Sequence, residues 1–364
     1  MFGDVYRGAR VLVTGHTGFK GSWLATWLTL LGADVTGYSI CIPSTPSNFE
    51  ASRLAESVRH LVGDVRDLSA LRAAFQVARP DYVFHLAAQS IVRTAYADPK
   101  TTFDINIGGT VNVLECLRAS PGVRAGVIIT SDKCYQNVEW PWGYRETDRL
   151  GGDDPYSASK AAAEAVCHAY AASYLGRDGL PPMATTRAGN VVGGGDWAVD
   201  RLVPDCVRAW TRGDTVVLRN PCATRPWQHV LEPLSGYLWL AARLTADPSL
   251  HGQAFNFGPS DLVSSSVEDV VRALTCRWEG ARWRVEPAND GRESTLLKLA
   301  VEKAAHRLGW RPVLAFEETM DLTAEWYREH LRQPVSMRET SCRQIDLYCA
   351  NARRMGLPWA GAAA

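Results

Sequence analysis

Short apolar runs alternate with longer segments of helical periodicity through the first half of the chain. A strand, a helix and a second strand in succession form a parallel βαβ unit, so this alternation predicts an α/β fold with a doubly wound parallel sheet. The predicted strands are Arg10–Thr14, Asp34–Ser39, Val58–Val62, Tyr82–Leu86, Gly126–Ser131 and Met183–Arg187.

After Arg187 the pattern changes to loops rich in glycine and proline. We therefore expect a smaller, partly interleaved C-terminal substrate domain over the carboxyl edge of the sheet. We place the first domain at 1–186, with part of 225–260 returning to it, the second at 187–335, and a helical tail at 336–364 after the break at Pro334. The predicted elements of this half are a strand at Val216–Arg219 and helices at Leu231–Leu244, Val267–Arg277, Phe316–Arg328 and Arg338–Met355.

Composition argues against several functions. Lys plus Arg equals Asp plus Glu at 39 each, so no broad electrostatic field draws the chain to nucleic acid or to an anionic membrane. The nine cysteines are scattered without a CxxC pair, so we expect neither a disulfide framework nor a metal, and a reduced cytoplasm fits best. No apolar run reaches the roughly 18 residues of a membrane span, and the first strand begins too early for a signal peptide.

Gly15, Gly18 and Gly21 stand where the first strand meets the first helix. At this junction the first glycine permits a tight turn, the second lets the backbone approach a pyrophosphate, and the third lets the helix pack closely on the sheet. A glycine turn can be purely structural, but the preceding strand and the apolar helix at Ser22–Leu31 favour a Rossmann-type dinucleotide site. The loop residues assigned to the cofactor are Gly15, Thr17, Gly18, Phe19, Lys20 and Gly21.

Two later segments fit the same cofactor. Asp64 follows the third strand, where its carboxylate could accept the adenine amino group, and small residues end the fourth strand, where a backbone must lie against adenosine. The second strand ends at Ser39 without the acidic residue that usually binds the ribose 2′-OH and without a nearby arginine, which leaves NAD and NADP both open. The residues assigned in these two segments are Asp64, Val65, Leu86, Ala87 and Ala88.

Tyr156 and Lys160 stand four residues apart at the start of a predicted helix, so they share one helix face. A nearby ammonium favours tyrosinate, and the phenolate can remove a hydroxyl proton while hydride leaves the adjacent carbon. Ser131 ends the fifth predicted strand and would hold the substrate's C4 oxygen. A YxxxK pair is common by chance, but together with the glycine loop and Ser131 it indicates transient oxidation of a hexose.

The order of glycine loop, Ser131 and Tyr156-xxx-Lys160 resembles the extended short-chain dehydrogenases/reductases. Thr130-Ser131-Asp132-Lys133 narrows the resemblance to the sugar-nucleotide 4,6-dehydratases, in which the two residues after the strand-end serine or threonine act on C6 and C5. The dTDP-glucose enzymes usually carry Asp-Glu there, whereas this chain carries Asp-Lys. This pair, with GHTGFKGSW at 15–23, WGYRE at 142–146 and RPWQHVLEPLSGY at 225–237, resembles the CDP-glucose 4,6-dehydratase family from about residue 10 to about residue 327.

The resemblance implies NAD as cofactor and CDP-glucose as substrate, with CDP-4-keto-6-deoxyglucose and water as products. Tyr156, Lys160 and Ser131 would then assist the oxidation of C4 by NAD, while Lys133 acts as base at C5 and Asp132 as acid at C6. Alternatively, Lys133 positions Asp132 or a substrate oxygen, and a water serves as the base. Three alternatives stay open: an NAD-dependent sugar-nucleotide 4-epimerase, a 4,6-dehydratase for another nucleotide, and a non-catalytic NAD-sensing protein. By analogy with related enzymes, a homodimer or a dimer of dimers would form through the predicted helices near Thr101–Leu117 and Tyr156–Tyr174.

Polar residues near the carboxyl ends of the strands are candidates for binding the sugar nucleotide. Asn190 follows the sixth strand, where ligands of parallel sheets bind. Arg219 and Arg225 offer guanidinium forks that match phosphate oxygens, although isolated surface arginines usually bind only water. We expect His229 to order its loop rather than to act as a base. The substrate-binding candidates are Gln89, Arg93, Asn190, Arg201, Arg219, Arg225 and His229.

Overall fold

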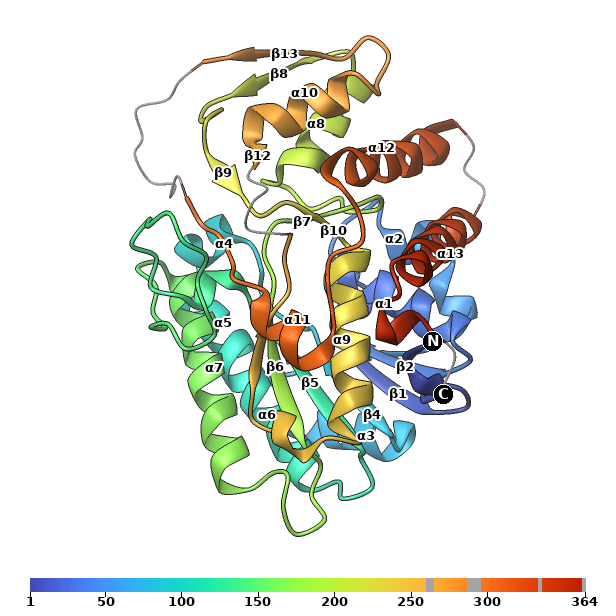
Figure 1. Cartoon of the computed structure of the whole chain (residues 1–364), viewed down its shortest axis with the longest axis vertical. Coiled ribbons are helices and arrows are strands. Elements are labelled where there is room, and N and C mark those ends of the chain that lie inside the picture. The colour runs from blue at the N-terminus through green and yellow to red at the C-terminus, as the bar shows by residue number, and fades with distance from the viewer. Residues whose placement is uncertain (260–264, 287–295, 333–335, 362–364) are drawn as a thin grey trace.

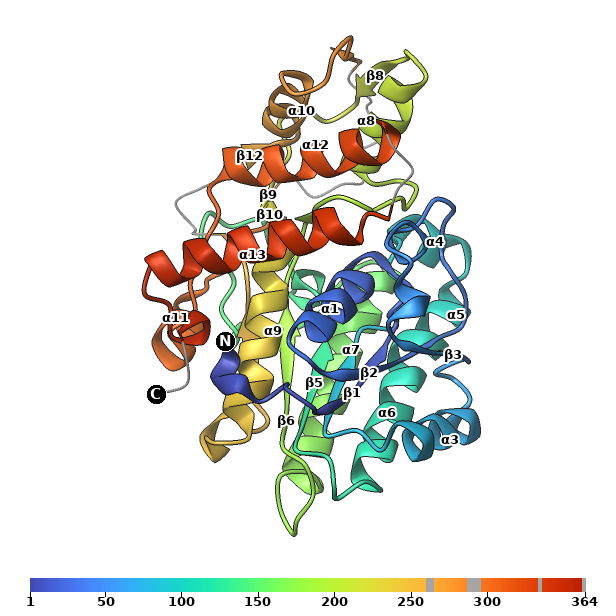
Figure 2. The same ribbon diagram turned by 90° about the vertical axis from the view of Figure 1, so that its right-hand side faces the viewer.

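The computed structural model describes residues 1–259, 265–286, 296–332 and 336–361. A parallel sheet with helices on both faces forms one part of the molecule, and a smaller group of helices and short strands lies at the upper end in Figure 1. The quarter-turn in Figure 2 shows the same two layers of helices on either side of the strands. The predicted α/β fold class is confirmed.

Seven strands form the main sheet. They are β1 (Arg10–Thr14), β2 (Asp34–Ser39), β3 (Arg59–Val62), β4 (Tyr82–His85), β5 (Ala125–Ile129), β6 (Met183–Arg187) and β11 (Ala254–Asn256). Their order is β11-β6-β5-β4-β1-β2-β3, and every neighbouring pair is parallel. The first, second and sixth predicted strands are confirmed to the residue. The fifth ends at Ile129 rather than at Ser131, because Ser131 caps the short turn η4 (Asp132–Cys134).

Each face of the sheet has its own helices. The helices are α1 (Phe19–Leu30), α3 (Leu68–Ala78), α6 (Gly109–Arg118), α7 (Pro155–Ser173) and α9 (Leu231–Leu244). Leu12 and Ile128 belong to the core beneath α3, α6 and α7, whereas Val11 and Val13 belong to the core beneath α1 and α9. This division follows from the strand geometry, since successive side chains point to opposite faces. The prediction for α9 is confirmed to the residue, but α1 begins three residues earlier than expected, at Phe19.

The smaller part is built from α8 (Leu202–Thr211), β8 (Thr215–Leu218), β9 (Thr224–Arg225), β12 (Ser265–Ser266), α10 (Val267–Thr275), β13 (Arg282–Val285) and α12 (Phe316–Arg332). Here β13 pairs parallel with β8, and β12 pairs antiparallel with β9. Between the two parts, β7 (Val191–Val192) pairs with β10 (Gln228–His229). The chain then returns to the main sheet through α9 and β11, which makes the second part interleaved with the first. The remaining short elements are η1 (Phe2–Asp4), α2 (Asn48–Ala51), η2 (Leu54–Glu56), α4 (Val92–Ala97), α5 (Pro99–Phe103), η3 (Asp104–Gly108), η5 (Pro248–Leu250), α11 (Glu302–Leu308) and η6 (Pro358–Ala360).

The C-terminal tail packs against the sheet domain. Its helix, α13 (Arg338–Arg354), lies where the sequence predicted one, while the break expected at Pro334 lies outside the described residues. From this helix the Tyr348 hydroxyl donates to Glu232 Oε2 on α9 at 2.7 Å. The Trp359 ring stacks on Phe2, with 5.2 Å between ring centroids. The tail therefore contacts and stabilises both α9 and the N-terminal segment.

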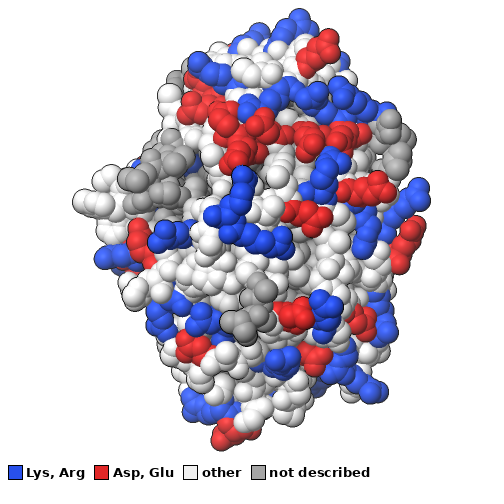
Figure 3. Space-filling view, turned by 45° about the vertical axis from the view of Figure 1, so that its right-hand side comes forward, with Lys and Arg blue, Asp and Glu red and all other residues white. Residues whose placement is uncertain are grey.

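Charges of both signs are interspersed on the face shown in Figure 3. Acidic side chains of α12 form ion pairs with neighbouring segments: Glu317 pairs with Arg277 at 2.7 Å, and Glu329 pairs with Arg343 at 2.7 Å. Within the described part of the chain, no helix combines the length and the apolar character that crossing a membrane would need.

Candidate active site

The fifth strand delivers Ser131, Asp132 and Lys133 to the carboxyl edge of the sheet. Ser131 has an extended backbone (φ −166°, ψ 157°), and its Oγ accepts a hydrogen bond from the Lys133 amide at 3.2 Å. The same hydroxyl donates to Asp132 Oδ1 at 2.9 Å. Ser131 and Asp132 are buried and Lys133 is half-buried. The turn thus joins a hydroxyl and a carboxyl into one unit beside a lysine.

The second carboxyl oxygen of Asp132, Oδ2, is buried and meets no hydrogen-bond partner among the described residues. Gly189, which follows β6, lies directly against it: a Cβ atom there would be 1.7 Å from Oδ2. A buried carboxyl oxygen without a partner is costly and calls for an explanation. A substrate hydroxyl bound at this oxygen would supply the missing partner and could receive its proton.

The start of α7 positions the tyrosine and the lysine. Pro155 occupies its first turn, and the Asp154 carboxylate caps it by accepting a hydrogen bond from the Ser157 amide at 3.0 Å. Proline and aspartate are favoured at these positions, because proline has no N–H to leave unsatisfied and aspartate accepts a free N–H. Tyr156 and Lys160 follow one helical turn apart, and both are buried.

Burial dominates the acid–base chemistry of this pair. It raises the pKa of Tyr156 to about 12, although a hydrogen bond with Ser131 and the nearby Arg201 guanidinium both act to lower it. Burial also lowers the pKa of Lys160 to about 8, and the Lys160 Nζ donates to the Ile129 carbonyl at 3.5 Å. Tyr156 therefore keeps its proton until further positive charge, such as that of an oxidised nicotinamide, enters the site.

The glycine loop forms a cradle that side chains would fill. Gly15 has a φ of +76°, and a Cβ there would lie 2.7 Å from the Ala87 amide nitrogen. A Cβ on Gly21 would lie 2.1 Å from the Gly15 carbonyl oxygen. Gly18 is the N-cap of α1 and makes no side-chain cap, so the N–H groups of the first turn are left for a ligand. This arrangement fits a dinucleotide pyrophosphate.

The other predicted cofactor residues surround this loop, with one complication. Leu86, Ala87 and Ala88 follow β4 next to it, and the Leu86 amide donates to the Thr14 carbonyl at 3.1 Å. The Asp64 carboxylate is held by Arg66, with 2.6 Å between Arg66 Nη2 and Asp64 Oδ2. Adenine would therefore meet an ion pair there rather than a free carboxylate. Val65 packs beneath α6, and the Thr17 hydroxyl donates to the Cys41 carbonyl at 2.7 Å.

Lys20 was assigned to the cofactor, yet it lies within electrostatic reach of the catalytic residues. Burial and the cations of Arg201 and Lys160 lower its pKa to about 8, while Asp132 and Asp196 act to raise it. Lys20 thus belongs to the glycine loop and is also affected by the charges of the catalytic residues.

His16 is a residue of this region to which the sequence assigned no role. Its Nδ1 lies 2.9 Å from Ser39 Oγ and its Nε2 lies 2.7 Å from His60 Nδ1. Burial and the proximity of His60 lower the His16 pKa to about 3, so the ring is neutral. A Cβ on Gly37 would lie 2.1 Å from the His16 ring. This neutral histidine lies at the end of β2, where the acidic residue that usually binds the ribose is absent. The sequence feature that could have indicated its role is a bulky residue between the first two glycines.

Two of the substrate candidates, Arg201 and Asn190, lie near the catalytic cluster, and a third, His229, lies in β10. Arg201 pairs with Asp196 at 2.9 Å and influences Tyr156 electrostatically. Asn190 follows β6 in a left-handed conformation with φ +44°. His229 is buried, and its Nδ1 accepts a hydrogen bond from the Leu231 amide at 3.4 Å, so it orders the start of α9.

The other four candidates have partners or positions of their own. The Gln89 side chain bonds to the Ile91 backbone within its loop, and Arg93 pairs with Asp200 at 2.9 Å on the surface. Arg219 is exposed after β8, and Arg225 lies in β9, both in the smaller part. The structure does not bring these four together with the catalytic residues at hydrogen-bond distance.

A buried ion pair supports the site from beneath. Glu164 and Arg187 are each 4% exposed and lie 2.8 Å apart. Thr130 and Thr185 also donate to the Glu164 carboxylate, at 2.5 and 2.9 Å. Because Glu164 follows Lys160 by one turn, the pair braces the catalytic helix against β5 and β6. Spacing on α7 places Glu164 near Lys160, but no local pattern indicates Arg187 as its partner.

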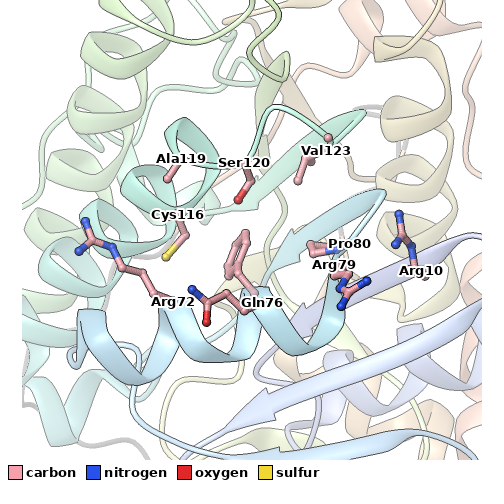
Figure 4. A pocket seen from close by; sticks show the side chains of 11 residues that line it. Arg10, Arg72, Gln76, Arg79, Pro80, Cys116, Ala119, Ser120 and Val123 are labelled. Atoms are coloured by element: carbon pink, nitrogen blue, oxygen red, sulfur yellow. The ribbon is translucent and has the colours of Figure 1, made fainter.

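A cavity of about 340 Å³ opens at the opposite end of the molecule, between α3 and the end of α6 (Figure 4). Arg10, Arg72 and Arg79 are among the residues that line it. It lies at the amino ends of the strands, whereas ligands of open parallel sheets bind at the carboxyl ends. We therefore do not assign the catalytic site to this cavity.

The strand order, the glycine cradle and the Ser131–Tyr156–Lys160 set define a dinucleotide-dependent enzyme of the extended short-chain dehydrogenase/reductase class. A profile of the GDP-mannose 4,6 dehydratase family matches residues 12–323. CDP-glucose 4,6-dehydratase of Salmonella typhimurium is 44% identical over 356 residues, which cover 96% of this chain and 99% of that protein. The chain therefore belongs to the GDP-mannose 4,6 dehydratase family of nucleotide-sugar 4,6-dehydratases, and the predicted resemblance is confirmed.

Other relatives agree with this assignment. The dTDP-glucose 4,6-dehydratase of Streptomyces griseus is 28% identical and covers 88% of this chain and 94% of its own. The UDP-glucose 4-epimerase of Thermus thermophilus, solved in complex with NAD, superposes with a TM-score of 0.75 at 27% identity over 88% of this chain and 99% of its own. The epimerase Mth375 of Methanothermobacter thermautotrophicus has a TM-score of 0.79 at 23% identity, covers 91% of this chain and 95% of its own, and supports the fold.

Proposed function

We propose that this dehydratase converts CDP-glucose to CDP-4-keto-6-deoxyglucose and water, with NAD as its cofactor. The observation that carries the chemistry is the buried Asp132 carboxyl, which is joined to Ser131 and has one oxygen without a partner among the described residues. The choice of CDP-glucose follows the relative that is 44% identical and bears that substrate in its name.

NAD, when bound, accepts hydride from C4 and later returns it to C6. The cradle of Gly15, Gly18 and Gly21 would hold its pyrophosphate, since backbone N–H groups and an uncapped helix start converge there. Lys20 supplies a further positive charge next to that cradle. The Thermus thermophilus relative that is 27% identical was solved with NAD, which supports the same cofactor here.

The residues of this chain then divide the proton transfers. Tyr156, hydrogen-bonded with Ser131, takes the proton of the C4 hydroxyl. The resulting ketone acidifies the C5 hydrogen, and Lys133 takes that proton. Asp132 donates a proton to the C6 hydroxyl, so that the C6–O bond breaks and water leaves. Lys133 finally returns a proton to C5, and the proton that Tyr156 took from the C4 hydroxyl replaces the one that Asp132 gave up.

The substrate-binding residues remain a proposal. Asn190, Arg219 and Arg225 would contact the diphosphate, because amide and guanidinium groups match phosphate oxygens. Gln89, Arg93 and Arg201 would line the sugar, and His229 would hold the loop that carries Arg225. Arg201 has the strongest support, since its guanidinium already acts on Tyr156.

Incubation with CDP-, dTDP-, GDP- and UDP-glucose, followed by mass analysis, tests the function. We expect CDP-glucose to give a product lighter by one water, without net consumption of NAD. A product of unchanged mass would indicate a 4-epimerase instead. Preference for another nucleotide would overturn CDP-glucose alone, and absence of turnover with all four would favour an NAD-sensing protein.

We also propose a homodimer, or a dimer of dimers, through α6 and α7. Phe103, Ile107 and Val111 recur every four residues before and within α6, and all three are partly exposed. Small alanines are exposed on the neighbouring α7, at Ala165 and Ala169. A second subunit could cover these apolar side chains. A monomeric mass by light scattering at micromolar concentration would contradict this.

The domain limits 1–186, 187–335 and 336–364 also remain our proposal, and we propose the cytoplasm as the location. All nine cysteines are free thiols, which suits a reducing compartment.

A further inference from the structure

The catalytic carboxyl and two hydroxyl groups of nearby elements each have a buried oxygen without a hydrogen-bond partner among the described residues. The three oxygens are Asp132 Oδ2, Thr186 Oγ1 and that of the Tyr237 hydroxyl. Thr186 and Tyr237 are fully buried, and Asp132 is 3% exposed. A buried polar group without a hydrogen-bond partner lowers the free energy of unfolding of the protein.

The backbone explains why these three groups meet. Thr185 and Arg187 both bond to Glu164 beneath α7, so Thr186 between them points to the opposite face of β6, toward α9. Tyr237 lies on α9, in the core beneath that same face. The carboxyl of Asp132 follows β5, the strand next to β6. Three neighbouring elements, β6, α9 and the turn after β5, thus each carry one of these oxygens.

Electrostatic effects agree with this placement. Burial raises the pKa of Tyr237, the Thr186 hydroxyl lowers it, and Asp132 and Tyr156 raise it further. Tyr237 is therefore close enough to sense both catalytic side chains. The Thr186 and Tyr237 hydroxyls are neighbours, since a hydrogen bond with Thr186 is what lowers the Tyr237 pKa, but neither oxygen meets a partner of ordinary hydrogen-bond geometry among the described residues.

We propose that Tyr237 is a positioning residue for the elimination step: its hydroxyl and that of Thr186 hold the Asp132 carboxyl through a bridging water. A buried water typically makes about three hydrogen bonds to polar groups that would otherwise lack them, which matches these three oxygens. The bridging water would donate a hydrogen bond to one side of Asp132 Oδ2 and leave the other side of this oxygen for the substrate, so it would fix the rotation of the carboxyl that protonates the C6 hydroxyl. It would also stabilise the carboxylate left after the proton is given. This inference rests on the proposed function.

Tyr237→Phe tests the proposal, because it removes the hydroxyl and keeps the ring that packs against Phe257. Loss of a hydrogen bond to a charged group should slow elimination roughly 10- to 100-fold. The oxidation at C4 should be unchanged, so rapid mixing with CDP-glucose should show a larger transient absorbance of reduced nicotinamide than in the unmodified enzyme. The value of kcat should fall while KM stays the same.

Tyr82→Phe is the matched control. Tyr82 is also fully buried with a hydroxyl that lacks a partner in the described part of the chain, but it begins β4 at the far end of the sheet. We expect this control to turn over normally. The unmodified enzyme is assayed first, and its failure to dehydrate CDP-glucose would reject the proposed function. If the unmodified enzyme does dehydrate CDP-glucose, two results would reject the role of Tyr237. One is an unchanged kcat and an unchanged transient absorbance of reduced nicotinamide in Tyr237→Phe, and the other is an equal loss of kcat in both variants.

Discussion

A Cβ atom on Gly189 would lie 1.7 Å from Oδ2 of Asp132. No side chain can share that space with the carboxyl, so Asp132, the proposed proton donor at C6, owes its position to a glycine on the neighbouring strand's loop. The same clash would involve both carboxyl oxygens, since Oδ1 would be 2.6 Å away. A substitution at this glycine must therefore rotate the carboxyl or shift the loop.

Gly189→Ala should consequently impair elimination more than nucleotide binding. We expect turnover to fall roughly 10²-fold or more, the scale of a displaced acid catalyst, with little change in the affinity for CDP measured by calorimetry. Gly122→Ala is a suitable control, because a Cβ there meets none of the described atoms within 4 Å and the backbone is not left-handed. Full activity in Gly189→Ala would show that the carboxyl can act from another position.

Tyr156→Phe should preserve the fold and nucleotide binding while slowing the reaction roughly 10²- to 10⁴-fold. In the proposed mechanism the Tyr156 phenolate accepts the C4 hydroxyl proton, so the variant should fail at the first step. No reduced nicotinamide should then accumulate when the variant is mixed with substrate. Near-normal turnover would remove the tyrosine from the mechanism.

Lys133→Met should stop the reaction one step later. Oxidation at C4 can still occur, but the C5 proton has no base to receive it. The expected result is enzyme-bound reduced nicotinamide together with the 4-ketone of the hexose, which can revert to unreacted hexose, and no deuterium from solvent at C5. Lys100→Met is the control, since that side chain is 81% exposed on α5. Undiminished elimination in Lys133→Met would leave this lysine a positioning residue.

The stability of the tail contact should depend on pH through Glu232. Burial raises the pKa of Glu232 to about 7, even though the Leu314 and Val313 amides and the Tyr348 hydroxyl donate to its carboxylate. In the unfolded chain the glutamate has its ordinary pKa of about 4.3. The folded state thus binds more protons between these values, so this contribution to stability is fully present at low pH and is lost as the pH rises through 7.

Glu232→Gln should remove that dependence. Between about pH 5 and 8 the unmodified protein should lose roughly 2–4 kcal/mol more of its free energy of unfolding than the variant does. Thermal unfolding at several pH values would measure the difference. If the free energy of unfolding changed with pH in the same way in both proteins, a raised pKa at this carboxyl would be contradicted.

The strands and the catalytic pair could be predicted because their signals are local. The valine-rich run of β1 stands directly before the glycine turn, and the pattern fixed both ends of the strand. Tyr156 and Lys160 share a helix face through their spacing alone. Parallel strands then bring Ser131 to the same edge, so the core of the site follows from sequence and topology.

The rest depends on contacts between distant segments. Nothing near Gly189 in the sequence shows that Asp132 will press against it, and nothing near Glu164 indicates Arg187. His16 takes its role from Ser39 and His60, which lie on other strands. The two-residue strands β7 and β10 are too short for any periodic signal. Such features become visible only when the sheet has been assembled.

Transfer of the C4 hydrogen within one sugar tests the central claim most directly. CDP-glucose labelled with deuterium at C4 would be converted by the enzyme in ordinary water, and the product would be examined by mass spectrometry and NMR. We predict a product lighter by one water that carries the deuterium at C6 and ordinary hydrogen at C5. Deuterium that remains at C4 in a product of unchanged mass would contradict the account.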